Sequence, residues 1–172
     1  MKKYTGPKDR SSAASDPTTS VDELSSLASS EYIFVREAVA ANANSTSVIL
    51  EALVPRSFVK EDDFRIAAGL LSNPSLPSTA CISLVGSIST AISKLEPRNY
   101  HAMIAIERLF AHPSAPIASL AELLRNKAFP QHLRGRIACE NSRMDVLNLL
   151  KDDLSENVRK RAPNVLERKA HS

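Results

Sequence analysis

Tryptophan is absent from this chain, glycine occurs only four times in 172 residues, and aromatic residues make up 5% of the sequence. β-Sandwiches and domains built on glycine-rich loops depend on many tight turns, and these turns depend on glycine. The shortage of glycine and aromatic residues therefore argues against both classes. Apolar residues account for 43% and charged residues for 24% of the chain, close to the average of globular proteins. We expect a folded, all-α protein.

Long hydrophobic runs are also missing. No apolar stretch approaches the roughly 18 residues that a membrane-spanning helix requires, and the N-terminal segment lacks the apolar core of a secretory signal. We therefore expect a cytoplasmic protein that has no membrane partner.

Residue patterns for catalysis or metal binding are lacking as well. The sequence contains no Gly-x-Ser-x-Gly turn, phosphate-binding loop or dinucleotide fingerprint. Its two cysteines, Cys81 and Cys139, occupy apolar positions of predicted helices, which favours buried thiols over a disulfide or a metal site. The four histidines are widely spread and form no metal-binding pair on one helix face. We expect a non-catalytic protein without a cofactor or a metal ion.

The chain does contain one sequence pattern that recurs at intervals of roughly 25 to 40 residues. Each copy has a Leu-x-x-Leu helix, a short break and an Ala-rich second helix. The second helix begins with a hydrophobic residue followed by an arginine, and it ends at Asn or His. A single copy cannot bury its own apolar face, so consecutive copies must stack. The pattern predicts a solenoid of about five degenerate two-helix repeats. The opening pairs are Val35-Arg36, Phe64-Arg65, Leu133-Arg134 and Val158-Arg159.

These repeats set the expected domain boundaries. Residues 1–17 are rich in Lys, Ser, Thr, Asp and Pro, and we expect them to be a disordered tail. The helical-repeat domain is predicted over residues 18–166, with an insertion around residues 87–99 in the third repeat. Residues 167–172 are expected to form a short basic C-terminal tail.

The segment VREAVAANAN at residues 35–44, echoed by FRIAAGLLSNPS and LRGRIACENS, resembles the leucine-rich repeat variant family of bacterial proteins. The likeness covers about residues 18–166, although His112 takes the asparagine position in the third repeat. It implies a right-handed superhelix similar to HEAT and armadillo solenoids, in which one helix of each pair tends to be a short 3₁₀ segment. It also implies an interaction platform. The iron–sulfur cluster of one member type is not implied, because no cysteine precedes Cys81.

The polar residues that recur in each copy of the pattern can be interpreted either as structural contacts or as parts of a binding surface. We expect the arginines of the opening pairs to form a ladder by donating to carbonyl groups or carboxylates of the adjacent repeat, with a binding groove as the alternative. Asparagines at the helix ends are predicted to be caps. These are Asn42, Asn73 and Asn141. Helical spacing selects four exposed residues of the second helices as candidates for partner specificity. These are Glu37, Ile66, Arg108 and Arg136.

Charge is distributed unevenly along the chain. The net charge is −4 over residues 21–124 and +5 over residues 125–172. A basic region favours nucleic-acid binding through neutralised phosphates, but the terminal repeats of a solenoid also need a polar outer surface. We therefore expect a scaffold that binds an unknown protein or peptide, with nucleic-acid binding through the basic repeats as the alternative. The candidate binding residues are Arg134, Arg136, Arg159, Lys160 and Arg161.

Overall fold

A computed structural model of the chain describes residue 4 and residues 6–94, 99–141 and 143–162. These residues form helices and no strand, which confirms the all-α prediction. A short 3₁₀ helix, η1 (Ile92–Lys94), follows α6, and residues 156–162 form a further helix that we call the C-terminal helix. The α-helices are α1 (Pro7–Ser15), α2 (Val21–Ala28), α3 (Ile33–Ala41), α4 (Ser47–Leu53), α5 (Glu61–Leu70), α6 (Ser78–Ala91), α7 (Tyr100–Ala111), α8 (Ile117–Arg125), α9 (Gln131–Glu140) and α10 (Met144–Leu150).

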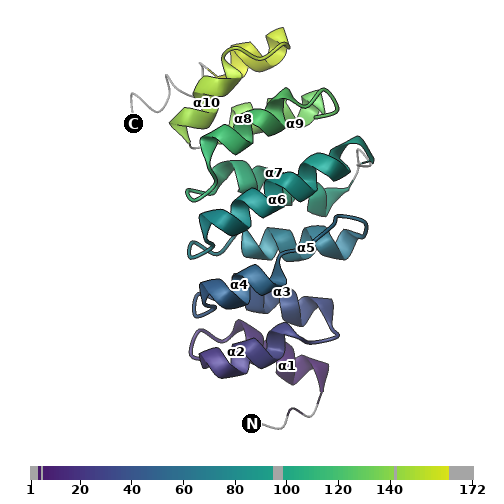
Figure 1. Cartoon of the computed structure of the whole chain (residues 1–172), viewed down its shortest axis with the longest axis vertical. Coiled ribbons are helices and arrows are strands. Elements are labelled where there is room, and N and C mark those ends of the chain that lie inside the picture. The colour runs from purple at the N-terminus through teal and green to yellow at the C-terminus, as the bar shows by residue number, and fades with distance from the viewer. Residues whose placement is uncertain (1–3, 5, 95–98, 142, 163–172) are drawn as a thin grey trace.

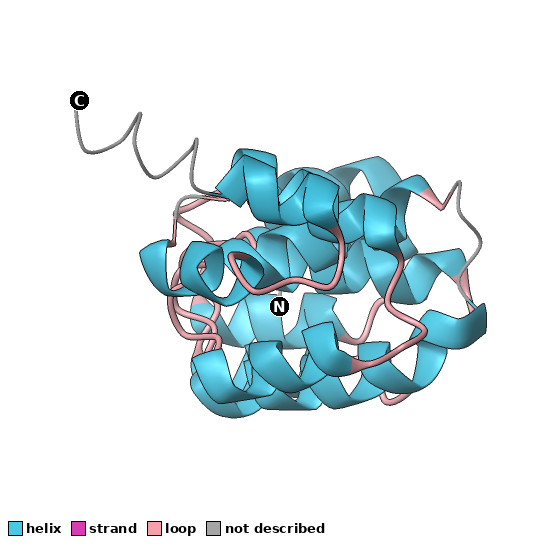
Figure 2. Ribbon diagram, turned by 90° about the horizontal axis from the view of Figure 1, so that it is seen from above, coloured by secondary structure: helices cyan, strands magenta, loops and turns pink. Residues whose placement is uncertain are grey.

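The helices form two rows that run along the long axis of the molecule (Figures 1 and 2). In the odd row, α3 packs on α1, α5 on α3, α7 on α5 and α9 on α7. In the even row, α4 packs on α2, α8 on α6 and α10 on α8. The described ends of the chain therefore lie at opposite ends of the stack (Figure 1).

Apolar residues at helical spacing explain why these segments are helical. Leu24 and Leu27 of α2, and Val35 and Val39 of α3, are buried between the rows. Ser20 is the N-cap residue of α2, since its hydroxyl accepts a hydrogen bond from the backbone N–H of Glu23 at 3.4 Å. The buried side chains of successive helices join in one continuous apolar core along the stack.

Gly69 marks a close approach between two helices of the odd row. A Cβ atom at this position would lie 2.9 Å from the carbonyl oxygen of Glu37 and 3.2 Å from the Cβ of Ala40. Both contacts belong to α3, so the missing side chain of Gly69 allows α5 to pack directly on the α3 backbone.

The same geometry recurs in the turn that follows each helix of the odd row. One side chain in each turn accepts a hydrogen bond from the backbone N–H two residues further on, at 2.8–3.2 Å. Asn42 and Asn141 are C-cap residues as predicted, whereas the C-cap residue of α5 is Leu71 and Asn73 shapes the turn two residues further on. The five accepting residues are Asp16, Asn42, Asn73, His112 and Asn141.

Two of these asparagines and His112 also connect successive turns. The Nδ2 of Asn42 donates to the carbonyl oxygens of Ala14 and Asp16, both at 2.9 Å. The Nδ2 of Asn73 donates in the same way to the carbonyl oxygen of Asn42 at 2.8 Å. The Nε2 of His112 lies 3.0 Å from the carbonyl oxygen of Asn73. We call this buried chain of hydrogen bonds the turn ladder.

The ladder predicted for the arginines is wrong for Arg36 and Arg159. The Nη1 of Arg36 donates to the carbonyl oxygen of Ser30 at 2.8 Å, and the Nη1 of Arg159 donates to that of Asp153 at 2.7 Å. Each acceptor belongs to the loop that precedes the arginine's own helix. These two side chains therefore fix a local loop and do not reach the adjacent repeat.

Arg65 and Arg134 do reach a carboxylate outside their own helix and its preceding loop. The Nη2 of Arg65 lies 2.7 Å from the carboxylate of Glu37, and the Nε of Arg134 lies 2.9 Å from that of Asp153. Their positions are not equivalent: counted back from the asparagine of the following turn, Arg36, Arg65 and Arg134 lie six, eight and seven residues away. Arg134 also donates to the carbonyl oxygen of Phe129 in the loop before its own helix, as Arg36 and Arg159 do in theirs.

The expected N-terminal tail contains a helix. α1 packs on α3, and Ala14 is fully buried, so residues 7–15 are part of the stack and the prediction of a disordered tail is wrong there. The hydroxyl of Thr19 donates to the carbonyl oxygen of Ala13 at 2.6 Å and holds the following turn. The buried contact is made by a small alanine, so the sequence lacks the hydrophobic periodicity from which a helix is predicted.

Three further expectations need correction or fall outside the described residues. Much of the predicted insertion is helical, because α6 continues to Ala91 and η1 follows it. Cys81 is buried as expected, but Cys139 is exposed. The end of the predicted repeat domain and the C-terminal tail, residues 163–172, lie outside the part that the structure describes. None of the described helices combines the length and apolar character needed to cross a membrane.

Candidate binding face

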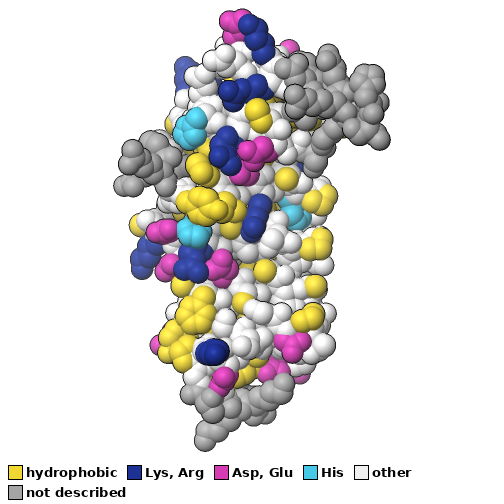
Figure 3. Space-filling model, turned by 180° about the vertical axis from the view of Figure 1, so that it is seen from behind, with side chains coloured by type: hydrophobic (Ala, Val, Ile, Leu, Met, Phe, Trp, Pro, Cys, Tyr) yellow, Lys and Arg dark blue, Asp and Glu magenta, His cyan; other side chains and the backbone are white. Residues whose placement is uncertain are grey.

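Aromatic side chains are exposed on the odd row. Phe34 of α3 is 38% exposed, and its ring lies 5.6 Å from the ring of Tyr32. Tyr100, at the start of α7, is 63% exposed. On the odd-row side of the molecule, hydrophobic side chains gather in patches that charged residues separate (Figure 3). We call this side the odd-row face.

The charges of the odd-row face connect neighbouring helices. Glu37 of α3 pairs with Arg65 of α5, and Glu107 of α7 pairs with Arg136 of α9. Between them, the Nη1 of Arg108 in α7 donates to a backbone carbonyl oxygen of α5 at 2.6 Å. These contacts link α3 to α5, α5 to α7, and α7 to α9.

The prediction that four residues of the second helices are exposed and available to a partner is therefore only partly correct. Glu37, Arg108 and Arg136 lie on the odd row but are engaged in contacts within the chain. Ile66 is only 7% exposed and belongs to the core, so its selection was wrong. The close packing of α3, α5 and α7 buries a position of α5 that helical spacing alone places outside.

Three further basic candidates, like Arg136 above, are occupied by partners in the chain. Arg134 pairs with Asp153 and also donates to the carbonyl oxygen of Phe129 at 2.6 Å. Arg159 donates to loop carbonyl oxygens at 2.7 and 3.0 Å. Lys160 forms an exposed ion pair at 2.6 Å with Glu156, which lies four residues earlier on the same helix. The first two stabilise loops, and the charge of the third is partly compensated.

The other two basic candidates, Arg136 and Arg161, line one surface depression of about 590 Å³. We call it the α9 pocket. It lies between the first turns of α9 and the C-terminal helix, and its remaining lining residues are Gln131, His132, Gly135, Asn157 and Val158. The lining includes two guanidinium groups, an imidazole and two carboxamides, but no carboxylate.

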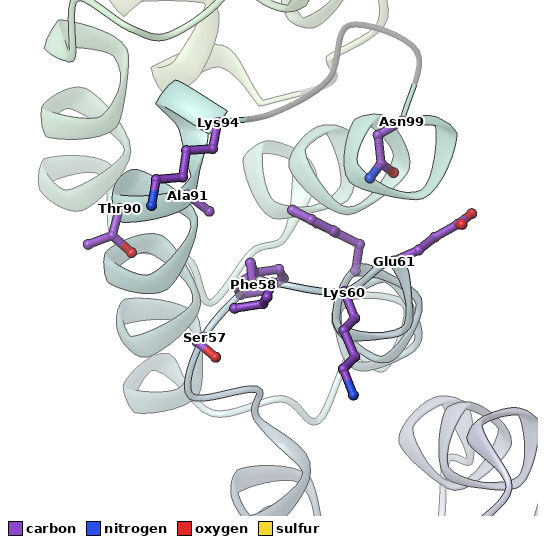
Figure 4. A pocket seen from close by; sticks show the side chains of 10 residues that line it. Ser57, Phe58, Lys60, Glu61, Thr90, Ala91, Lys94 and Asn99 are labelled. Atoms are coloured by element: carbon purple, nitrogen blue, oxygen red, sulfur yellow. The ribbon is translucent and has the colours of Figure 1, made fainter.

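A second depression, of about 480 Å³, lies between the start of α5 and the end of α6 (Figure 4). Its centre is aromatic, because the rings of Phe58 and Phe64 are 4.6 Å apart. Lys60 and Glu61 point away from Phe58 (Figure 4). No set of polar groups converges on this space, so it lacks the features of a specific polar site.

The turn ladder places Cys81 close to a histidine, but the pair is not a nucleophilic site. The Sγ of Cys81 lies 3.6 Å from the Nδ1 of His112, and both residues are buried. Burial raises the pKa of the Cys81 thiol to about 11, despite the opposing charge of Arg143. The thiol is therefore protonated at neutral pH and is unreactive. Within the described residues, no group of His, Cys, Asp and Glu has the arrangement of a metal site.

Compared with known protein families, with curated proteins and with solved structures, the chain has no match. The assignment of a function therefore depends on the geometry of the odd-row face and of the α9 pocket.

Sequence reasoning selected Arg136 and Arg161 but missed the aromatic residues and the polar lining of the pocket. The one available signal was the position of Phe34 and Tyr100, which lie outside the apolar stripes of their helices. Nothing in the local sequence indicates that Asn157 and His132 lie at one pocket, since only the packing of two helices brings them together.

Proposed function

We propose that this chain is a non-catalytic helical-repeat scaffold that binds a protein partner through the odd-row face. In this proposal, the helix pairs are about five repeats of a right-handed solenoid similar to the leucine-rich repeat variant proteins. One observation carries the functional part: aromatic side chains remain exposed on a row whose charged groups are largely paired with one another. Aromatic residues are the side chains that most often dominate the energy of protein interfaces.

The packing of the odd row supports a binding surface of fixed dimensions. Phe34 lies on α3 and Tyr100 on α7, with α5 packed between these helices. Packed helices are about 8–10 Å apart, so the axes of α3 and α7 are about 16–20 Å apart across α5. The turn ladder holds this spacing through buried hydrogen bonds. A partner that matches it would lose little free energy to ordering of the scaffold.

The ion pairs favour a protein over a nucleic acid as the partner. A nucleic-acid-binding protein neutralises several phosphates with basic side chains that are available to them. Here the charges of Arg134, Arg136 and Lys160 are already matched by carboxylates. Nucleic-acid binding therefore requires the loss of contacts within the chain, whereas a protein partner can use the exposed aromatic residues directly.

The test is a comparison between two surface variants. The variant Phe34→Ser/Tyr100→Ser removes the aromatic sites of the odd-row face. The control Val48→Ser/Ile82→Ser removes apolar side chains that are 73% and 50% exposed on the even row. Proteins captured from lysate by the unmodified chain are identified, purified and titrated against all three forms.

We expect a purified partner whose affinity falls at least tenfold with the odd-row variant and changes little with the control. Equal loss with both variants would contradict the proposal. So would recovery that depends on nucleic acid and disappears after nuclease treatment.

A further inference from the structure

The α9 pocket differs chemically from the rest of the basic C-terminal region. Its polar side chains are those of Arg136 and Arg161 together with His132 and two carboxamides, of which Gln131 already donates its Nε2 to the hydroxyl of Ser155 at 2.7 Å, and none of them is a carboxylate. An arginine guanidinium presents donors in a planar fork that matches the two oxygens of a carboxylate or a phosphate. The lining therefore suits an oxyanion.

Arg161 is the least compensated of the basic candidates. Among the residues that the structure describes, it has no hydrogen bond or ion pair, whereas Arg134, Arg159 and Lys160 each have one. Arg136 directs its Nε toward Glu107, and its Nη2 lies 3.7 Å from Glu140. Arg161 thus provides an unpaired positive charge that an external anionic ligand can neutralise.

Gly135 explains how the guanidinium of Arg161 reaches the pocket. A Cβ atom on Gly135 would lie only 2.9 Å from the Nη1 of Arg161. The absence of a side chain at this point of α9 leaves room for the guanidinium beside the helix backbone. α9 also begins without a side-chain cap, so the positive end of its helix dipole adds to the charge near His132.

We propose that the α9 pocket binds a carboxylate of an acidic segment of the protein partner. This inference rests on the proposed function and names the chemistry of one part of that partner. A carboxylate and a phosphate share the same pair of acceptor oxygens, but one uncompensated guanidinium suits a single charge better than a phosphate chain, which requires a series of cations.

The test uses the full-length chain, isotope-labelled, and follows the backbone signal of Gly135 and the side-chain Nε–H signal of Arg161 by NMR. The probes are a hexaglutamate peptide, a hexalysine peptide, inorganic phosphate and a short oligothymidylate at constant ionic strength. The variants are Arg161→Ala and, as a matched control, Lys160→Ala. Both remove one positive charge at neighbouring positions, but Lys160 already pairs with Glu156.

We expect hexaglutamate to shift both signals and hexalysine to shift neither. Arg161→Ala should weaken hexaglutamate binding about tenfold or more, and Lys160→Ala less than about twofold. Gly135→Ala is a second variant that displaces the guanidinium and keeps α9 intact, since alanine favours a helix. It should weaken binding while the melting temperature stays the same or rises.

Four results would overturn the inference: no shift with hexaglutamate, equal losses in Arg161→Ala and Lys160→Ala, tighter binding of inorganic phosphate than of hexaglutamate, or binding of oligothymidylate alone. Failure of this inference is distinguishable from failure of the proposed function. If Arg161→Ala leaves the affinity of the captured partner unchanged while Phe34→Ser/Tyr100→Ser removes it, the pocket assignment alone is wrong.

Discussion

The Nδ2 of Asn73 lies 2.8 Å from the carbonyl oxygen of Asn42, a residue 31 positions earlier that ends the preceding helix of the odd row. Both residues are buried, and each also accepts a hydrogen bond from its own turn. One side chain therefore shapes a turn and joins it to the previous one. These contacts add to the apolar core in holding successive helices of the odd row together.

Replacing Asn73 with alanine should destabilise the protein strongly. The variant leaves the buried carbonyl oxygen of Ala40 without its donor, while the carbonyl oxygen of Asn42 keeps the N–H of Ser45 and the N–H of Ser75 is close to solvent. An unsatisfied buried group costs about 1–3 kcal/mol, so we expect a loss of about 1–3 kcal/mol in the free energy of unfolding, measured with urea. The control Asn148→Ala changes an exposed residue of α10 and should cost less than about 0.5 kcal/mol. Equal effects would show that the ladder contributes nothing specific.

Two glycine-to-alanine variants should have effects of opposite sign. In Gly86→Ala, the new Cβ meets nothing within 4 Å, and the higher helix propensity of alanine should stabilise the protein by up to about 1 kcal/mol. In Gly69→Ala, the Cβ would approach a backbone oxygen of α3 to 2.9 Å. The required shift of α5 should cost about 1–3 kcal/mol. Thermal unfolding measures both changes, and stabilisation by both would contradict the close packing of α3 and α5.

α1 should behave as part of the folded stack. Ala14 is fully buried, whereas Ser15 is exposed. An aspartate at position 14 would place an unpaired charge in the core, so Ala14→Asp should cost about 3 kcal/mol or more. Ser15→Asp should change stability by less than about 0.5 kcal/mol. A disordered N-terminal segment would tolerate both substitutions equally in a urea titration.

The two thiols should differ in reactivity. Cys139 is exposed and Cys81 is buried, so a thiol reagent should modify one cysteine in the native protein and both in denaturant. Mass spectrometry of the labelled peptides identifies which residue has reacted. Rapid native labelling of Cys81 would show that the core around the turn ladder opens readily.

Cys81 should also make stability depend on pH in the alkaline range. Its thiol has a pKa of about 11 in the folded chain, against 9.0 for an unperturbed thiol, because burial disfavours the thiolate. The unfolded chain therefore loses this proton first as pH rises, and the contribution of the thiol is lost progressively between pH 9 and about 11. The loss amounts to about 2–3 kcal/mol. In Cys81→Ala this part of the pH dependence should disappear, and an unchanged profile would contradict the assignment.

Most helices could be predicted from the sequence, because the apolar residues that repeat at helical spacing in them are also the buried ones. Leu24 and Leu27 repeat at helical spacing and both are buried. The same reasoning failed for α1, whose buried contact uses the small side chain of Ala14, and it ended α6 too early, although Ile92 continues the buried stripe through η1. Periodicity detects large apolar residues and gives no signal where a helix packs through alanine.

The candidate site was harder to predict because its residues are selected by contacts between distant segments. Arg134 and Arg161 have the same charge and similar sequence surroundings. Only the stack shows that Asp153 compensates Arg134, while Arg161 lies beside Gly135 without a partner in the described part of the chain. The asparagines were recognised as caps from local turn chemistry, but their second role depends on a turn about 30 residues away, which local chemistry cannot indicate.

Hydrogen–deuterium exchange of the chain with and without its purified partner tests the central claim most directly. Binding through the odd-row face should slow exchange in α3, α5, α7 and α9, and it should leave the exposed turns of α2, α4 and α6 unchanged. Protection confined to the even row, or equal protection of both rows, would contradict the account.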